Sequence, residues 1–333
     1  MGCNLAIAGV TGAVGQEFLK VIEEREFPFD SLKVLASSRS AGKTIEFKGK
    51  QYVVEELTKK SFTRVDIALF SAGASRSKEF APAAVQVGAV VVDNSSAFRM
   101  DPEVPLVIPE INPQRIKENK GIIANPNCST IIGIVPVWPL HKANPVKRMV
   151  VSTYQAASGA GQSAMLELEH QAREILAGKK PTCKGFPYQI AFNVFSHDSA
   201  LGPNGYNQEE TKMVNETRKI FDCPGIAITC TCIRIPVFRA HCESINLEFT
   251  GPITPDQVRD LLSTAPGVCV LDDREHNRFP MPIDATGKDD VFVGRIRQDE
   301  SIPENRGINI WVAGDQLRKG AALNAVQIAE KLL

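Results

Sequence analysis

The 333-residue chain lacks a charge excess of either sign, because 38 Lys and Arg residues balance 38 Asp and Glu residues. Without a net field, attraction to nucleic acid or to an anionic membrane is not expected, and a small-molecule partner is favoured. The first apolar run, residues 5–10, is too short for a membrane span, and no basic segment precedes it. The sequence therefore predicts neither a nucleic-acid partner nor a membrane partner.

The chain also lacks any Cys-x-x-Cys pair, although it contains eight cysteines. Scattered cysteines in a chain of this length indicate neither a zinc site nor a disulfide framework. We therefore expect no metal, a reducing cytoplasmic setting, and mostly buried, structural cysteines. No internal repeat or low-complexity linker interrupts the chain.

What the chain does contain is a glycine-rich turn between a predicted strand at residues 3–9 and a predicted helix at 13–25. Glycine lets backbone N–H groups approach a pyrophosphate, and the start of the helix adds its dipole. A tight strand–helix turn without a nucleotide is the alternative reading. The residues predicted to contact a dinucleotide here are Gly9, Thr11, Gly12, Ala13, Val14 and Gly15.

The end of the second predicted strand, residues 32–36, indicates which nucleotide is bound. An NAD site usually has Asp or Glu there, to hold the ribose 2′-hydroxyl. This chain has Ser37, Arg39 and Ser40 instead. A guanidinium with neighbouring hydroxyls suits a 2′-phosphate, so NADP is favoured over NAD.

The order of apolar runs predicts two domains. Runs at 65–70 and 88–92, with a helix at 77–87, extend a parallel sheet of the Rossmann type. Beyond residue 127 the pattern becomes α+β, with a mixed, largely antiparallel sheet. The strands expected there are 148–155, 243–250, 290–296 and 307–313, and the helices are near 162–177, 209–221 and 255–264.

Residues 316–333 form a predicted amphipathic helix that returns to the first domain. The predicted dinucleotide-binding domain is therefore 1–127 plus 314–333. The predicted catalytic and dimerisation domain is 128–313.

Cys128 lies in the run Asn-Pro-Asn-Cys-Ser-Thr, residues 125–130. A thiol is a useful nucleophile when it is partly ionised, which a helix N-terminus or a nearby base promotes. The turn residues before Cys128 and the apolar run after it favour a helix that begins close to this cysteine. A hydride-carrying nucleotide and an acyl-carrying thiol together indicate interconversion of an aldehyde and an activated acid.

Six motifs in order resemble the aspartate-β-semialdehyde dehydrogenase family over essentially the whole chain. They are DNSSAFRM (93–100), NPNCST (125–130), YQAASGAG (154–161), QEETKM (208–213), CIRIPVFRAH (232–241) and GDQLRKGAALNAVQ (314–327). The resemblance implies reduction of L-aspartyl-β-phosphate by NADPH to L-aspartate-β-semialdehyde and phosphate. This reaction serves lysine, threonine, methionine and diaminopimelate biosynthesis.

By the same resemblance, Cys128 carries the acyl group as a thioester, His241 is the acid/base, and Gln155 orients the substrate. Imidazole suits proton transfer near neutral pH. Arg234 matches the residue that holds the substrate α-carboxylate, and Arg239 is its rival. Residues 234 and 241 would point in opposite directions on one regular strand, so a bend near Pro236 is expected.

The remaining substrate and cofactor positions also follow from the resemblance. Arg99 and Lys212 match the phosphate-binding residues. Glu209, three residues before Lys212 and on the same helical face, matches the carboxylate that holds the substrate amine. Its neighbour Glu210 is the alternative. Further cofactor contacts near the nicotinamide match Ser158, Gly159 and Gln316.

Three other functions are weighed against this one. N-acetyl-γ-glutamyl-phosphate reductase shares the cysteine chemistry but usually has Gly before the cysteine, where this chain has Asn127. A glyceraldehyde-3-phosphate dehydrogenase would have a Thr-Thr-Asn run after its cysteine. A non-catalytic NADP-binding sensor would need none of the catalytic residues together. Members of the family are at least dimeric, so a homodimer or a dimer of dimers is expected.

Overall fold

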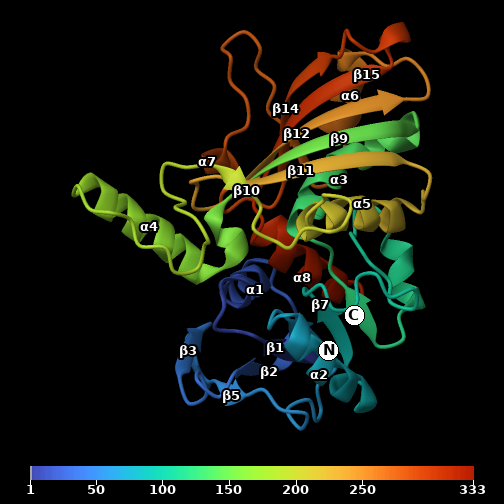
Figure 1. Cartoon of the computed structure of the whole chain (residues 1–333). Helices are drawn as coiled ribbons and strands as arrows, with labels where there is room; N and C mark the ends of the chain where they lie inside the picture. The colour runs from blue at the N-terminus through green and yellow to red at the C-terminus, as the bar shows by residue number, and fades with distance from the viewer. Residues whose placement is uncertain (1) are drawn as a thin grey trace. The chain divides into compact units, whose positions relative to one another are not determined.

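In the computed structural model, which describes residues 2–333, the chain forms two compact units (Figure 1). The first contains the chain up to Asn127 together with Ala321–Leu333, and the second is Cys128–Gly320. Residues 314–320, predicted to belong to the first unit, lie in the second. The reason is that Asp315 accepts hydrogen bonds from Arg239 and Gly287, and Gln316 accepts one from Ala240.

The first unit is built on a six-stranded, fully parallel sheet of order β5-β2-β1-β6-β7-β8. Its strands are β1 Cys3–Ala8, β2 Phe29–Ala36, β5 Glu55–Glu56, β6 Ile67–Phe70, β7 Val90–Asp93 and β8 Ile122–Ala124. Its helices are α1 Ala13–Glu24, α2 Ala74–Gln86, the 3₁₀ helix η1 Pro113–Glu118 and α8 Leu323–Glu330. The predicted parallel sheet is confirmed. A hairpin of β3 Thr44–Phe47 and β4 Lys50–Val53 was not predicted.

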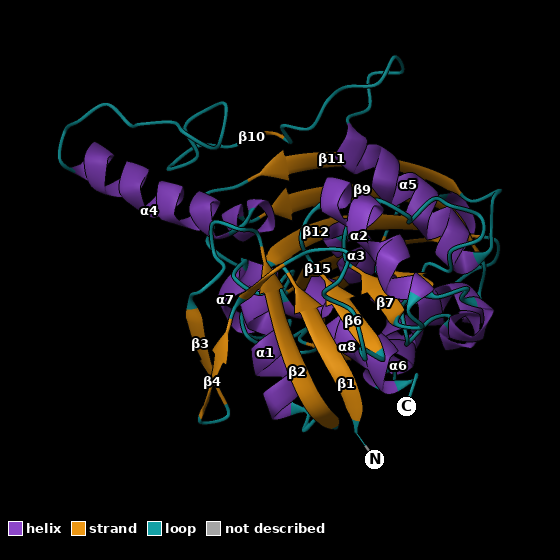
Figure 2. Cartoon of the chain, turned by 90° about the horizontal axis from the view of Figure 1, so that it is seen from below, coloured by secondary structure: helices purple, strands orange, loops and turns teal. Residues whose placement is uncertain are grey.

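Both faces of this sheet are covered (Figure 2). Leu5 and Ile7 point to a core shared with α1 and α8, while Ala6 and Ala8 point to a core shared with α2. Alternate residues of a strand face opposite sides, and apolar residues on both sides are the pattern of a buried parallel strand. The sheet therefore presents only its strand ends for binding.

The last helix differs from the prediction. It starts as a π-helical turn, η4 Arg318–Ala322, and continues as α8. Residues 318–326 are all buried, so the segment is not amphipathic. Its polar side chains suggested a solvent-exposed face, but several of them form hydrogen bonds inside the protein. Asn324, for example, donates to the side-chain oxygen of Asn125 and to the backbone oxygen of Val107.

The second unit contains a seven-stranded mixed sheet of order β10-β11-β9-β12-β15-β14-β13. Most of its pairings are antiparallel, as predicted, and only β9–β11 and β13–β14 are parallel. The strands are β9 Val146–Gln155, β10 Phe195–Ser196, β11 Ala227–Arg234, β12 His241–Phe249, β13 Val268–Val270, β14 Val291–Gln298 and β15 Gly307–Gly314. Strand β11 was missed because polar Thr residues interrupt its apolar run.

Helices α3, α5 and α6 pack on this sheet, and α3 contacts both of the others. The helical segments of the unit are α3 Cys128–Ala143, η2 Ala157–Ala160, α4 Gln162–Leu176, α5 Gln208–Phe221, α6 Pro255–Ser263, α7 Pro282–Ala285 and η3 Pro303–Asn305. Helix α3 is apolar and buried almost all round, as expected for a helix inside a core, and it contains two internal prolines. Its first residue is the predicted nucleophile.

Candidate active site

Three neighbouring strands each have one terminus at the same end of the mixed sheet: β9 and β11 finish there and β12 begins there. Arg234, the last residue of β11, pairs with Gln155, the last residue of β9. On the other side of β9, Cys242 pairs with Tyr154, so His241 starts β12 at this edge. Residues 235–240 cross the end of β9. The expected bend near Pro236 is therefore a crossover between two strands that flank a third.

Cys128 lies beside this edge at the start of α3. Its Sγ is 3.5 Å from Nε2 of His241. The positive end of the helix dipole favours a thiolate at this position. The π-helical turn closes the other side, since a β-carbon built on Gly320 would lie only 3.0 Å from the β-carbon of Cys128. Glycine at 320 thus lets this turn lie close to Cys128 without a β-carbon that crowds it.

His241 is completely buried. Its Nδ1 accepts a hydrogen bond of 3.0 Å from the main-chain N–H of Ala156. Burial, and secondarily the positive charge of Arg234, lowers the pKa of His241 to about 3, while the negative charge of Glu209 opposes the shift. The ring is therefore neutral over the physiological pH range.

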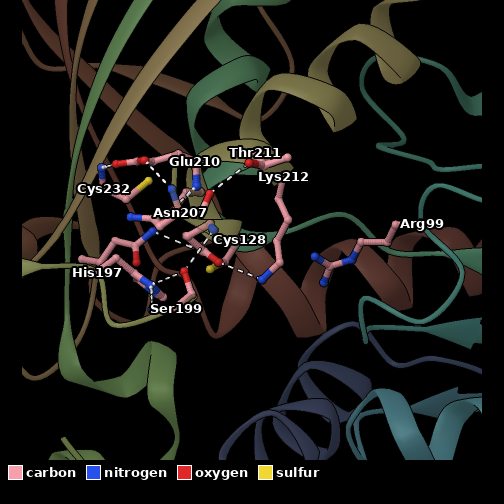
Figure 3. A network of polar contacts seen from close by, with 12 residues as sticks. Arg99, Cys128, His197, Ser199, Asn207, Glu210, Thr211, Lys212 and Cys232 are labelled. Atoms are coloured by element: carbon pink, nitrogen blue, oxygen red, sulfur yellow. Dashed lines mark hydrogen bonds and ion pairs between the residues drawn. The ribbon is translucent and has the colours of Figure 1, made fainter. Parts of the chain in front are cut away.

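Charged side chains of both signs lie near Cys128 in the second unit (Figure 3). Glu209 Oε2 accepts a hydrogen bond of 2.9 Å from Lys212 Nζ, and Glu209 Oε1 accepts one of 3.3 Å from Gln155 Nε2. Gln155 also donates to Ser129 Oγ at 2.6 Å. Arg234 is buried, and its Nη1 would lie 3.2 Å from a β-carbon at Gly159. These groups can hold an amine, a phosphate and a carboxylate.

The geometry distinguishes the two pairs of alternatives that the sequence left open. Glu210 completes the capping box of α5 with Asn207 and accepts a hydrogen bond from the backbone of Cys232, so both its oxygens serve the fold. Arg239 donates to the fully buried Asp315 at 2.7 Å. Glu209 and Arg234 are left as the better candidates for substrate contacts.

Two further residues at this place were not predicted. His197 follows β10, and its Nδ1 accepts a 3.2 Å hydrogen bond from the main chain of Ser199. Burial, and next the charge of Arg234, lowers the pKa of His197 to about 4. Asp198 lies 3.4 Å from Arg234 Nε. The loop 197–206 has no sequence signal for a site, because pairing of β10 with β11 alone brings it here.

Ser158 and Gln316 are joined in the second unit, where Gln316 Nε2 donates to Ser158 Oγ. Both side chains are buried, and Gly159 lies next to Ser158 in η2. Arg99 belongs to the first unit, where its side chain donates to the backbone oxygens of Asn125 and Asn94.

The glycine turn of the first unit borders a cavity of about 430 Å³. Gly9 has a positive φ of +92°, and a β-carbon at Gly15 would lie 2.2 Å from Gly9 O, so both positions require glycine. Ala13, Val14 and Gly15 form the first turn of α1. The cavity is lined by Gly9, Thr11, Gly12, Ala36, Ser37, Arg39, Ser40, Lys43, Leu57, Ser71, Ala72 and Arg76.

Three cations, Arg39, Lys43 and Arg76, line this cavity, but only Arg39 was predicted. Lys43 follows the predicted Ser-Ser-Arg-Ser turn, and Arg76 lies in the first turn of α2. The cavity lies at the carboxyl ends of β1, β2 and β6, where parallel sheets of this kind bind nucleotides. A turn that admits a backbone–phosphate contact and a cationic rim fit a phosphorylated dinucleotide.

Residues 2–333 contain no cluster of His, Cys, Asp and Glu suited to a metal ion, and none of the eight cysteines in this range forms a disulfide. No helix in the same range has the length and apolar character needed to cross a membrane.

Comparison with known families assigns both units. Residues 4–119 match the semialdehyde dehydrogenase NAD-binding domain, and residues 137–319 match the semialdehyde dehydrogenase dimerisation domain. A thiol beside an imidazole at the end of a mixed sheet, with a separate nucleotide-binding unit, fits this class. The fold and the site thus define an oxidoreductase of the semialdehyde dehydrogenase class.

Relatives that match almost the whole chain identify the family within this class. An aspartate-semialdehyde dehydrogenase of Synechocystis sp. is 55% identical over 330 residues, which cover 99% of this chain and 97% of the relative. One from Aquifex aeolicus is 53% identical over all of this chain and 98% of its own. The chain belongs to the aspartate-semialdehyde dehydrogenase family.

Solved structures agree with this assignment. A structure of aspartate semialdehyde dehydrogenase II from Vibrio cholerae, described as complexed with ASA, superposes with a TM-score of 0.96 at 47% identity, covering 100% of this chain and 98% of that one. A Candida albicans structure described as containing NADP has a TM-score of 0.77 at 25% identity, covering 100% of this chain and 98% of that one.

Proposed function

We propose that the chain catalyses the NADPH-dependent reductive dephosphorylation of L-aspartyl-β-phosphate to L-aspartate-β-semialdehyde and phosphate. The pathways served would be those to lysine, threonine, methionine and diaminopimelate. The observation that carries the proposal is the Cys128 thiol at the start of α3, 3.5 Å from His241 and beside groups suited to a charged amino acid. The Vibrio cholerae relative described with ASA supports the substrate class.

In this proposal Cys128 attacks the acyl carbon, and expulsion of phosphate leaves a thioester on Sγ. Arg234 binds the α-carboxylate, and Glu209 binds the α-amine. Arg99 and Lys212 bind phosphate, and Gln155, held by Ser129, orients the acyl group. Holding the reacting carbon near the thiolate contributes through proximity and orientation.

We propose NADP rather than NAD as the cofactor, and when bound it supplies the hydride that reduces the thioester. The support is the cationic rim of the cavity at the glycine turn, because Arg39, Lys43 and Arg76 suit a 2′-phosphate. Gly9, Thr11, Gly12, Ala13, Val14, Gly15, Ser37 and Ser40 would hold the rest of that half. Ser158, Gly159 and Gln316 are proposed to contact the nicotinamide half.

A spectrophotometric assay in the reverse direction tests the proposal. L-aspartate-β-semialdehyde, inorganic phosphate and NADP⁺ should give NADPH, and omission of phosphate should stop turnover. N-acetylglutamate semialdehyde is the comparison substrate, because its reductase shares the cysteine chemistry. Preference for the acetylated aldehyde would reject the proposed substrate.

We further propose that the protein is a homodimer or a dimer of dimers in a reducing, cytoplasmic setting. The match of residues 137–319 to a dimerisation domain supports assembly, and eight unbridged cysteines support the setting.

A further inference from the structure

The residues that follow β7 and β8 in the first unit are both asparagines. Asp93 ends β7 and pairs with Ala124, which ends β8. Asn94 and Asn125 therefore occupy the same level of the parallel sheet. The ladder continues for one more step, since the main-chain nitrogen of Asn125 donates to Asp93 O at 2.8 Å. Side chains at matching positions of neighbouring strands lie side by side, so the register of the sheet brings the two amides together.

The side chain of Asn125 is bonded at both of its polar atoms. It is completely buried. Its Nδ2 donates to Asn94 Oδ1 at 2.6 Å and to the main-chain oxygen of Ala321 at 3.3 Å. Its Oδ1 accepts a hydrogen bond of 2.7 Å from Asn324 of α8. Because a main-chain carbonyl can only accept, the contact with Ala321 identifies the nitrogen of the amide, and the Asn125 side chain is held in one orientation.

The same two asparagines hold Arg99 through their main-chain oxygens. Arg99 Nε donates to Asn125 O at 2.9 Å, and Arg99 Nη2 donates to Asn94 O at 3.0 Å. Nε and Nη2 form one edge of the planar guanidinium, so two hydrogen bonds on this edge fix both its plane and its direction. The contacts form a closed ring, in which the amide pair joins the two asparagines on one side and Arg99 joins them on the other.

The turn that leads from β7 to Arg99 is also held from the side of α2. Asp93 is fully buried, and its Oδ1 accepts a hydrogen bond of 2.7 Å from Ser77 Oγ of α2. Its Oδ2 accepts one of 2.7 Å from Ser95 Oγ. These bonds fix the start of the turn, while the amide pair ties the turn to the end of β8. The acceptors of Arg99 are thus set from two directions.

We propose that Asn94 and Asn125 are a pair of positioning residues that orders Arg99 for phosphate. The inference rests on the proposed role of Arg99 in phosphate binding and adds the two residues that hold it. An arginine side chain has several rotatable bonds, and ordering it during binding reduces affinity. Because the pair orders Arg99 when the chain folds, phosphate meets a guanidinium that already has its direction.

The reverse reaction allows KM for inorganic phosphate to be measured separately from the other two KM values. Asn94→Ala and Asn125→Ala should each raise KM for phosphate at least about fivefold, because Arg99 must then be ordered during binding. KM for L-aspartate-β-semialdehyde and KM for NADP⁺ should each change by less than about twofold. Asn94 is only half-buried, so its variant provides the measurement if Asn125→Ala does not fold.

Asn112→Ala is the matched control. Asn112 is a buried asparagine of the same unit, and its amide bonds to the main chain at Leu106 and Ile108. Its replacement should lower the melting temperature as Asn125→Ala does, yet leave KM for phosphate unchanged. An equal rise of KM for phosphate in Asn112→Ala and Asn125→Ala would reflect general loss of structure and would contradict the positioning role.

A variant with both substitutions tests whether the two asparagines act as one unit. If they do, KM for phosphate in Asn94→Ala/Asn125→Ala should lie within about twofold of the larger single effect, because either single change already breaks the ring. A rise equal to the product of the two single effects would show that the asparagines act independently, and the proposed pair would be wrong.

Crystal structures of the two single variants provide a readout that needs no substrate. The Arg99 side chain should be displaced or spread over several conformations in both, and unchanged in Asn112→Ala. An unchanged Arg99 in Asn94→Ala and Asn125→Ala would overturn the inference, whichever reaction the enzyme catalyses. Conversely, turnover of the native chain without phosphate would reject the proposed reaction, while the crystal structures would still decide whether the pair holds Arg99.

Discussion

At the scale of single residues, the eight cysteines differ by environment and not by chemistry. Cys230, Cys232 and Cys242 are buried in strands, and burial raises the pKa of Cys242 to about 12. Cys128 alone combines a helix N-terminus with a neighbouring imidazole. Its neighbours, not its thiol, make it the candidate nucleophile.

The first prediction concerns this thiol. Cys128→Ser should fold and bind NADP but lose at least about a hundredfold in kcat, because a hydroxyl is a much weaker nucleophile at neutral pH. Cys183→Ser, at an exposed loop cysteine, is the control and should be fully active. Mass spectrometry of the native enzyme with L-aspartyl-β-phosphate and without nucleotide should locate the acyl adduct on residue 128, because expulsion of phosphate forms the thioester and no hydride is present to reduce it. Near-normal turnover of Cys128→Ser would refute the thioester route.

The second prediction concerns Arg39 at the cofactor cavity. Arg39→Ala should raise KM for NADP⁺ at least about tenfold, since a charge-assisted hydrogen bond is worth about 1.5–3 kcal/mol. KM for NAD⁺ should change little, because NAD⁺ has no 2′-phosphate. Lys59→Ala, an exposed lysine outside the cavity lining, is the matched control. Equal effects on both nucleotides would show that Arg39 does not read the 2′-phosphate.

Glu243 is the least expected charged residue of the second unit. It is fully buried in β12, and neither carboxyl oxygen has a hydrogen-bond partner in the described part of the chain. A β-carbon at Gly133 of α3 would lie only 2.4 Å from Glu243 Oε2. Burial raises the pKa of Glu243 well above its ordinary value of 4.5, so the side chain is an uncharged acid in the folded protein.

The third prediction follows from the direction of this shift. Above about pH 4.5 the unfolded chain ionises Glu243 while the folded chain keeps it protonated. The contribution of Glu243 to stability is therefore full below that pH and falls by about 1.4 kcal/mol per pH unit above it, until the pH passes the raised pKa of the folded state. Glu243→Gln removes this slope, so the variant should gain stability over the native chain as pH rises from 5 to 8. Urea unfolding at several pH values measures the free energy of unfolding of both proteins. If the two free energies changed with pH in parallel, the prediction would be wrong.

At the scale of elements, helix α5 presents two of the proposed substrate contacts. Its capping box joins Asn207 and Glu210, and Glu209 and Lys212 lie in the first turns that this cap fixes. The cap is thus coupled to the geometry of the site. Helix α6 has the same kind of box, with Thr254 and Gln257, but carries none of the proposed site residues.

The fourth prediction compares these two caps. Asn207→Ala should destabilise the protein by about 1 kcal/mol and raise KM for L-aspartate-β-semialdehyde more than it lowers kcat. Thr254→Ala should cost about the same stability and leave both kinetic constants unchanged. Thermal unfolding and steady-state kinetics on both variants make the comparison. Equal effects of the two substitutions on KM and kcat would show that the α5 cap does not influence substrate binding.

Elements with a strong period and clear boundaries were predictable from the sequence. The strands and helices around Gly9 were found because apolar runs end at glycine, and α3 was placed because turn residues precede Cys128. The prediction that the final helix is amphipathic was wrong, since polar residues such as Asn324 are buried and paired inside the fold. Strand pairing also decides which loops meet. His197 and Asp198 reach Arg234 through β10, a strand of two residues that no sequence period reveals.

At the scale of the whole molecule, the mixed sheet gathers distant parts of the sequence at one edge. Gln155, Arg234 and His241 come from three strands that are adjacent in the sheet but separated by up to 86 positions in the chain. Each of these residues was predicted from a sequence motif, but only the strand order β11-β9-β12 explains why the three side chains lie close together. Fold and site are therefore specified by the same hydrogen-bond register.

The fifth prediction is the mass of the assembly. The dimerisation-domain match leads us to expect a dimer, with a mass of about twice the 36.3 kDa of the chain by light scattering, or twice that again for a dimer of dimers. The mass should not depend on nucleotide. A monomer at micromolar concentration with full activity would contradict the proposed assembly.

The glycine at position 320 has a consequence for anyone who wishes to make this enzyme more heat-resistant. Exchanging a helical glycine for alanine is a standard stabilising substitution, worth up to about 1 kcal/mol. Here the added methyl would press on the β-carbon of Cys128, 3.0 Å away, and displace the sulfur from its working position. Libraries of such substitutions therefore need an activity screen beside the melting temperature, because at position 320 the gain in helix propensity is opposed by crowding of the nucleophile.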